Sequence, residues 1–394
     1  MEKIKEKKID TIIFQVFLFL LSLVTIFVLK DYIGGRYVGN INFVLFPLVA
    51  IFMLARRYKL PIIEKTYIYS LCIGFILHFL VGADDFSRIG NSLFSRIVPI
   101  LLLSLAMQQK TTPKIFIAFF VLFFVSECGL SIYEKLTMNH YYKYDSIDDF
   151  LATTASMDDT ASFRSYSLML HPLFNANTVS VCLAFILCAK QIKGIFKYTF
   201  IVLGLLALWG FNSRGAMIIW SIILFYRIAL YKAKPIYVVT ILIVLYFVLP
   251  PLIEWILYSG ILGRLADFDF SDSSTLTRFE AYETFFSEKW SFYDIIAGGR
   301  EICYPGTQII LENGFLVDLG YWGIIIGSVK ILGELLITYK AIIKYSIKDK
   351  ILIMLSIWGV AFMNNNSYQT WLMPIFVMAC VSFNSFMPYR NKDN

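Results

Sequence analysis

Apolar residues run along most of this chain in long stretches with few polar interruptions. A stretch of about 17 to 25 apolar residues is long enough to cross the hydrocarbon core of a bilayer as a helix. The pattern predicts about twelve such helices, at 11–30, 41–55, 66–82, 93–108, 115–132, 170–189, 198–212, 215–231, 236–259, 315–338, 351–364 and 368–387. Because the stretches lack a two-residue alternation, we expect an all-α, polytopic membrane helix bundle that forms a single transmembrane domain over 1–394.

Composition supports the membrane interpretation. Of 394 residues, 58% are hydrophobic and 17% aromatic, and the mean hydropathy is +0.68. This is more apolar surface than one water-soluble core buries. The formal net charge of +7 does not indicate a nucleic-acid partner, because the basic residues are scattered between apolar stretches instead of gathered in one patch.

The scattered basic residues orient the bundle. They concentrate in alternate short loops, which the positive-inside rule assigns to the cytoplasm, and both termini then lie on that side. The loops contain Arg56, Arg57, Lys59 and Lys65; Lys110 and Lys114; Lys190, Lys193 and Lys197; Arg227, Lys232 and Lys234; and Lys340, Lys344, Lys348 and Lys350. Part of this charge is available to anionic lipid of the inner leaflet, so membrane lipid is an expected partner.

Two external segments, 133–165 and 260–312, are longer than simple connectors. In the second, Thr277 and Glu280 match a helix capping box. Aromatic residues then recur on one helical face at Phe279, Tyr282, Phe285 and Phe286. We expect an amphipathic helix of about three turns along the outer membrane surface, with Trp290 at the interface.

Two arginines on the outer side are candidates for binding an anion. Arg278 falls in the first turn of the expected amphipathic helix, where free backbone N–H groups also favour an anion. Arg214 stands in "NSRG", a polar break at the outer end of a membrane segment. Pairing of Arg278 with Asp272 or Glu280, and snorkelling of Arg214 to the membrane surface, are the alternatives. Together the two guanidinium groups favour a phosphorylated lipid.

Several motifs, taken in order, resemble the O-antigen polymerase and O-antigen ligase superfamily of bacterial inner-membrane proteins. They are "NSRGAMIIWSI", "TRFEAYE", "DIIAGGR" and "LENGFLVDLGYWGII", and they fall within 170–340. The resemblance implies a metal-independent inverting glycosyltransferase whose substrate is a glycan on undecaprenyl diphosphate. It implies that Arg214 and Arg278 hold the diphosphate, and that a chain-length regulator and a flippase are partners.

The motif "ENGF" favours the polymerase branch. Ligases of this superfamily typically have a histidine before the asparagine, and here the residue is Glu312. A carboxylate can take the proton of an acceptor hydroxyl, so we expect Glu312 to be the general base and Asn313 to hold the acceptor or the loop. The alternative is that Glu312 forms a structural ion pair with Arg278 or Arg300. Ligation of finished polymer and transport of the lipid-linked oligosaccharide remain the alternative functions.

Three further residues are weaker candidates for the substrate cavity. His171 and Asn175 lie in "HPLFNANT" at the start of a membrane segment, where capping of the helix is the alternative role. Arg164, just upstream, is a third outer cation or an exposed loop charge.

Lys330 and Glu334, four residues apart, are expected to form an intramembrane pair facing the bundle.

The sequence predicts no metal site and no cofactor. The six cysteines form no CxxC or Cys/His pattern, and no glycine-rich nucleotide loop is present. The acidic run Asp267, Asp269 and Asp272 lacks a complete calcium-binding loop.

Overall fold

In the computed structural model the described residues are 13, 15–20, 41–55, 58–81, 86–107, 114–141, 163–169, 172–227, 273–299, 302–303, 313–363 and 372–383. For 41–45, 55, 81, 86–92, 95, 273–279, 363 and 372–374 the backbone alone is described. Helices and the turns between them account for this part of the chain, and no β-strand occurs in it. The predicted all-α class is confirmed.

The observed helices follow the predicted apolar stretches closely. They are α2 (Ile41–Ala55), α3 (Ile62–Val81), α4 (Phe86–Ala106), α5 (Lys114–Thr137), α7 (Pro172–Cys188), α8 (Gly194–Gly210), α9 (Arg214–Phe225), α15 (Ile347–Met354) with α16 (Val360–Met363), and α17 (Leu372–Phe383). A π-helical segment, Leu355–Gly359, joins α15 to α16. The predicted helix 236–259 lies outside the described residues, and the prediction at 11–30 is described only at 13 and 15–20, which are helical.

Two described helices, over Ile62–Leu80 and Lys114–Thr137, are long and apolar enough to cross a membrane. Four shorter apolar helices accompany them, at Arg96–Ala106, Pro172–Cys188, Gly194–Gly210 and Arg214–Phe225. Length and apolar composition alone identify these spans.

One predicted membrane helix, 315–338, is wrong as a single element. It is divided into α13 (Gly314–Trp322) and α14 (Ile324–Ala341) at Gly323, whose φ is +79°. Side-chain-bearing residues rarely adopt this φ, so a glycine permits the sharp change of direction. The apolar pattern continues across the break because α13 and α14 pack on each other, which keeps both helices apolar.

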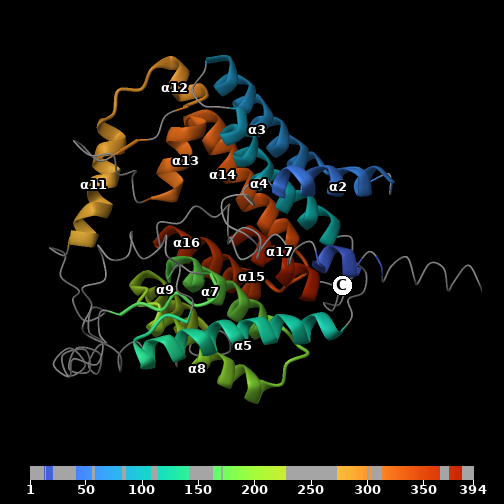
Figure 1. Ribbon diagram of the computed structural model, residues 1–394, viewed down its shortest axis with the longest axis vertical. Helices are drawn as coiled ribbons and strands as arrows, with labels where there is room; N and C mark the ends of the chain where they lie inside the picture. Colours follow the sequence, from blue (N-terminus) through green and yellow to red (C-terminus); the bar gives the residue numbers. More distant parts are fainter. Residues whose placement is uncertain are drawn as a thin grey trace, which may run out of the picture. The chain divides into compact units, whose positions relative to one another are not determined.

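The chain forms two compact units, described separately. The first comprises Met1–Val121, Arg278–Lys350 and Asn365–Asn394. In it α3 packs against α14 and α4, and α4 also contacts α2 and α17 (Figure 1). Helix α11 (Ser273–Ser287), through its part after Arg278, lies beside α13, and the short helix α12 (Phe292–Ile296) packs against α14 (Figure 1).

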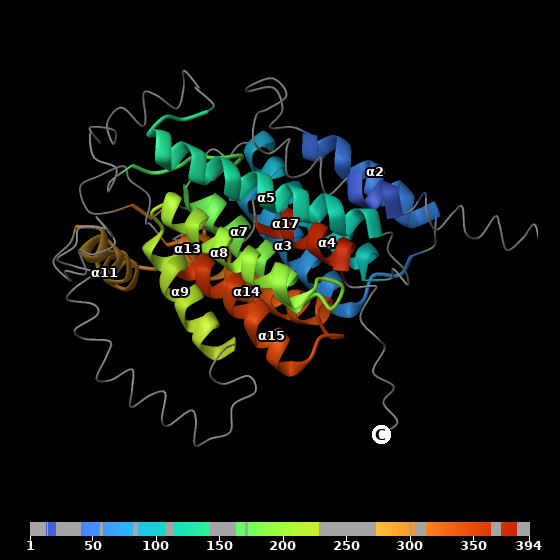
Figure 2. The same cartoon turned by 90° about the horizontal axis from the view of Figure 1, so that it is seen from below.

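The second unit comprises Leu122–Thr277 and Ile351–Asn364. Helix α7 is buried along most of its length and packs against α8, α9 and the π-helical segment (Figure 2). The indole N–H of the buried Trp220 on α9 donates to Ser180 Oγ on α7 at 2.8 Å. This bond satisfies the polar atom of a large core side chain, which fixes α9 against α7.

Candidate functional site

The "NSRG" motif forms a tight polar turn between α8 and α9. Asn212 has φ of +52°, and Ser213 is the N-cap of α9, with its hydroxyl accepting from Ala216 N at 3.4 Å. Arg214 is the first residue of α9 and is partly exposed. The predicted polar break is therefore confirmed. Its arginine stands at a helix N-terminus, where the helix dipole adds to the guanidinium in favouring an anion.

The segment 163–169 packs directly on this turn. Ser165 N donates to Gly210 O at 3.0 Å, and Ser165 Oγ donates to Ser131 O at 2.7 Å. A Cβ on Gly210 would lie 2.4 Å from Ser131 Oγ, so glycine is needed where α5, α8 and the segment meet. Arg164, half-buried, precedes Ser165. Two of the predicted cations, Arg164 and Arg214, are thus carried by neighbouring pieces of backbone.

A polar stripe on α5 holds the segment in place. Glu134 is buried, and its carboxylate accepts from the backbone N–H groups of Tyr141 at 3.0 Å, Tyr166 at 2.7 Å and Ser167 at 3.0 Å. Two turns earlier, Glu127 Oε2 accepts from Leu168 N at 3.2 Å. Backbone donors bound to carboxylates satisfy polar groups that an apolar helix surface would leave unpaired.

Lys135 completes the stripe. Its ammonium group donates to Phe163 O at 2.6 Å and lies 5.2 Å from the ring centroid of Trp209. The residues of the stripe are Glu127, Ser131, Glu134 and Lys135. Sequence reasoning did not single them out, although their spacing places all four on one helix face within a mainly apolar helix. That spacing was the available signal.

Asn175 supports the same segment from α7. Its Oδ1 accepts from Met169 N at 2.9 Å, and its Nδ2 donates to Tyr166 O. The side chain is fully buried. The structure therefore gives Asn175 a role in fixing the backbone beside Arg164, while its contact with a substrate stays a prediction. His171 lies outside the described residues.

The "ENGF" motif begins helix α13 in the first unit. Asn313 is its N-cap, and Asn313 Oδ1 accepts from Phe315 N at 3.1 Å and Leu316 N at 3.2 Å. Asn313 Nδ2 donates to the hydroxyl of Tyr282 on α11 at 2.9 Å. The asparagine thus joins two helices and satisfies two orphan donors at a helix start. Glu312, the residue before it, lies outside the described residues.

Helix α11 begins earlier than predicted. It starts at Ser273, so Thr277 is not its N-cap, and Arg278 lies in its second turn rather than its first. The prediction that Arg278 lies beside the free backbone N–H groups of a helix start is therefore wrong, because these groups belong to the first turn. Only the backbone of Arg278 is described.

The aromatic face of α11 differs from the prediction in part. Ala281 and Phe285 are buried with Leu316 of α13, and Tyr282 packs at the edge of this cluster. Phe286 is 76% exposed, and Trp290 packs on Phe285 with ring centroids 4.9 Å apart. Helix α11 is thus anchored to α13 through one narrow apolar face.

Two glycine motifs of the first unit meet face to face. Gly298 and Gly299 have φ of +67° and +97°, and Gly299 N donates to Tyr321 O at 2.8 Å. A Cβ on Gly298 would lie 2.3 Å from both Gly320 O and Gly323 N. The motifs "IIAGGR" and "LGYWG" therefore pack backbone on backbone. Arg300, the next residue after Gly299, lies outside the described residues.

The chain after α12, which contains Ala297 and Gly298, is also fixed to the end of α3. His78 Nε2 donates to Ala297 O, and the His78 ring stacks on Trp322 at 5.6 Å. Tyr293 OH donates to Leu77 O at 3.0 Å. Burial, with a contribution from Asp294, raises the pKa of Tyr293 above its ordinary value, so the donor is kept.

Charged side chains of α13, α14 and α4 form a largely buried cluster. Asp318 contacts Lys330 Nζ at 2.7 Å and Arg96 at 3.7 Å. Lys330 also contacts Glu334 at 3.6 Å, and Glu334 accepts from Tyr67 OH at 2.8 Å. The predicted pairing of Lys330 with Glu334 is confirmed. Asp318 and Arg96 were not predicted as members, because the bend between α13 and α14 brings Asp318 to Lys330, and Arg96 comes from α4, which is far away in sequence.

Comparison with known proteins adds no further assignment: a scan of family models and a search of curated proteins give no match. No cluster of three or more metal-ligating side chains occurs among the residues that the structure describes.

Proposed function

We propose that the protein is a polytopic membrane glycosyltransferase that joins glycan repeat units carried on undecaprenyl diphosphate. The observation that carries the proposal is Arg214, partly exposed at the N-terminus of α9 and placed beside the segment that contains Arg164. Guanidinium groups and a helix start are suited to a diphosphate. A diphosphate carried by a lipid is a substrate that belongs beside apolar helices.

The proposed membrane arrangement is a bundle of about twelve helices in the bacterial inner membrane, with both termini in the cytoplasm. The segments 133–165 and 260–312 lie on the outer face, and the second holds the glycan near its amphipathic helix. The apolar length of α3 and α5 supports this arrangement.

In the proposed reaction, a hydroxyl of the acceptor sugar attacks the anomeric carbon of the donor. A bond forms between these two atoms, and the bond from the anomeric carbon to the diphosphate oxygen breaks. The acceptor proton passes to Glu312. Arg214 and Arg278 neutralise the charge that develops on the leaving diphosphate. The proposed substrate-binding residues are Asn313, Arg300, Arg164, His171 and Asn175.

A transporter of the same lipid-linked oligosaccharide is a second candidate. The observation that favours it is the buried cluster of Arg96, Asp318, Lys330 and Glu334, since ionisable groups buried between apolar helices often mark transport pathways. The functions separate in an assay with purified protein in detergent. A glycosyltransferase lengthens lipid-linked repeat units there, whereas a transporter leaves their length unchanged.

The proposal is tested by deleting the gene and complementing it with Arg214→Ala, Arg278→Ala or Glu312→Gln. Loss of long glycan chains, with single repeat units retained, is the expected result on a gel of surface glycan. Long chains that persist without attachment to their final lipid would instead identify a ligase. Arg227→Ala, at the opposite end of α9, is the matched control and should restore full-length polymer. Full-length polymer from all three site variants would overturn the site.

A further inference from the structure

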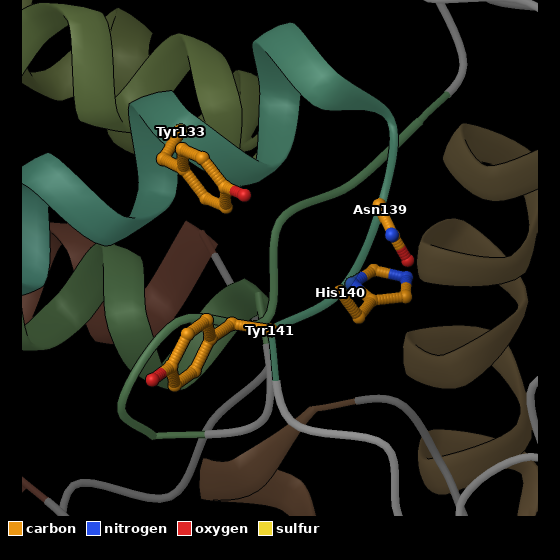
Figure 3. A pocket seen from close by; sticks show the side chains of 4 residues that line it. All are labelled: Tyr133, Asn139, His140 and Tyr141. Carbon is orange, nitrogen blue, oxygen red and sulfur yellow. The ribbon is translucent and has the colours of Figure 1, made fainter.

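A cavity of about 380 Å³ lies at the end of α5 in the second unit. Its lining side chains are Tyr133, from the last turns of α5, and Asn139, His140 and Tyr141, from the chain just after that helix (Figure 3). Cavities of about 300 to 1,000 Å³ are typical of small-molecule sites. The proposed diphosphate site does not include these four residues.

The wall of the cavity is fixed by Glu134 beneath it. This single carboxylate accepts from Tyr141 N, Tyr166 N and Ser167 N, and it lies 3.8 Å from His140 Nδ1. The His140 ring stacks on Tyr166 at 4.0 Å and on Phe163 at 4.8 Å. A binding site whose wall is already ordered loses less entropy when a ligand enters.

The strained backbone around the cavity supports a functional role. Met138, where α5 has just ended, has φ of +51°, and Ser167, on the facing segment, has φ of +39°. Side-chain-bearing residues rarely adopt such conformations, which persist where surrounding bonds hold them. Here the Glu134 carboxylate accepts hydrogen bonds from Tyr141 N, in the chain after α5, and from Ser167 N, in the facing segment.

The lining side chains offer flat apolar faces together with hydrogen-bonding edges. Tyr133 and Tyr141 are 54% and 64% exposed, and both line the cavity. Tyrosine gives a rigid amphipathic surface, and the Asn139 amide both donates and accepts hydrogen bonds. A sugar ring has the complementary chemistry, with C–H groups on its face and hydroxyls on its rim.

The segment 163–167 contacts both the "NSRG" turn and His140, one of the residues that line the cavity. Tyr166, which stacks on His140, is the neighbour of Ser165, which donates to Gly210 O at the start of the turn. A ligand whose anionic end lies at Arg164 and Arg214 therefore has its next groups close to the cavity.

We propose that this cavity binds an uncharged sugar ring of the lipid-linked glycan whose diphosphate is held beside Arg214. The inference rests on the proposed function for the identity of the glycan. Tyr133 and Tyr141 stack on the sugar, Asn139 bonds its hydroxyls, and Glu134 is a positioning residue that acts through the backbone.

The test measures binding without turnover. The probe is the glycan released by mild acid from the host's lipid-linked repeat unit, and the readout is saturation-transfer NMR with the full-length protein in detergent. Tyr133→Ala and Tyr141→Ala should each weaken binding about tenfold, because each removes a stacking ring. The corresponding phenylalanine variants should stay within about threefold of the unchanged protein. Tyr69→Ala, an equally exposed tyrosine on α3, is the control and should have no effect.

The proposal is overturned if the released glycan does not bind, if both alanine variants bind it as well as the unchanged protein, or if phenylalanine weakens binding as much as alanine. Failure of the proposed function is a separate result. In that case repeat units are not lengthened by the unchanged protein, whatever the NMR shows. If lengthening occurs, Tyr141→Ala should raise KM for the lipid-linked donor about tenfold and change kcat little. An unchanged KM also overturns the cavity assignment.

Discussion

The carboxylate of Asp318 lies 2.7 Å from the ammonium group of Lys330, and both side chains are buried. This pair attaches α13 to α14 through a side-chain contact close to the bend at Gly323. A buried charge that loses its partner is far more costly than an exposed one.

Lys330→Met should therefore destabilise the protein by about 3 to 5 kcal/mol, because Asp318 is left with the more distant Arg96. The double variant Asp318→Asn with Lys330→Met should recover part of this loss. The measurement is the thermal unfolding midpoint in detergent. Lys348→Met, at an exposed lysine on α15, is the control and should cost less. Equal losses in the two lysine variants would contradict the expectation.

Glu134→Ala should loosen the two segments of backbone that are bonded to this carboxylate, one at Tyr141 and the other at Tyr166 and Ser167. Three backbone N–H groups lose their acceptor, and each buried donor left unpaired costs about 1 to 3 kcal/mol. Hydrogen exchange at Tyr141, Tyr166 and Ser167 should accelerate together. Exchange on α7, for example at Cys182, serves as the internal reference and should change little. Unchanged protection of the three amides would show that other contacts hold them.

Gly298→Ala should disrupt the contact between the two glycine motifs. The added Cβ would lie 2.3 Å from Gly320 O, and the backbone has φ of +67°. We expect a loss of more than about 1 kcal/mol in unfolding free energy. Gly129→Ala is the matched control, because a Cβ at this position in α5 meets nothing within 4 Å. A helix gains about 0.5 to 1 kcal/mol from that change, so the two substitutions should have opposite signs.

Asn313→Ala should weaken the start of α13 by about 0.5 to 2 kcal/mol, because Phe315 N and Leu316 N lose their cap. Asn313→Asp keeps an accepting oxygen and should restore the cap, while it removes the donor to Tyr282. Tyr282→Phe removes that one bond alone. Unfolding free energies measured in detergent should be lowered most by Asn313→Ala. If Asn313→Asp lowers the unfolding free energy as much as Asn313→Ala, the bond to Tyr282 has the main role.

Arg214→Ala should reduce kcat/KM for lengthening of lipid-linked repeat units by at least about 100-fold, if the guanidinium stabilises the leaving diphosphate. Arg214→Lys should restore little, because an ammonium group cannot donate through a planar fork. The control is Arg227→Ala, two residues beyond the end of α9. A lysine variant with full activity would reduce the role of Arg214 to that of a single positive charge.

The sequence predicted the elements that depend only on residues close together in the chain. The bounds of α2, α7 and α8 and the start of α5 follow from apolar length, whereas α5 continues five residues beyond its predicted end at 132. The turn at "NSRG" follows from a polar break between two apolar helices. The pair of Lys330 and Glu334 follows from their spacing of four residues on one helix.

The features that were missed depend on contacts between distant segments. The bend at Gly323 depends on the backbone of Gly298, and an apolar pattern does not record it. The start of α11 was misplaced because a capping-box pattern also occurs inside a longer helix. His140 was not predicted, because its neighbours Phe163 and Tyr166 come from a segment more than twenty residues away.

Glu134 ties Tyr141 to Tyr166, two points of the chain that are separated by a long intervening stretch. Because loop-closure entropy grows only slowly with length, that stretch can be extended, shortened or replaced while both of its ends stay fastened to the same carboxylate. The connection between the two bonded segments, residues 142–162, can therefore vary in length without loss of the bonds that Glu134 makes. Under the proposed function, a change in that connection would alter the glycan that is accepted while the supporting helices stay the same.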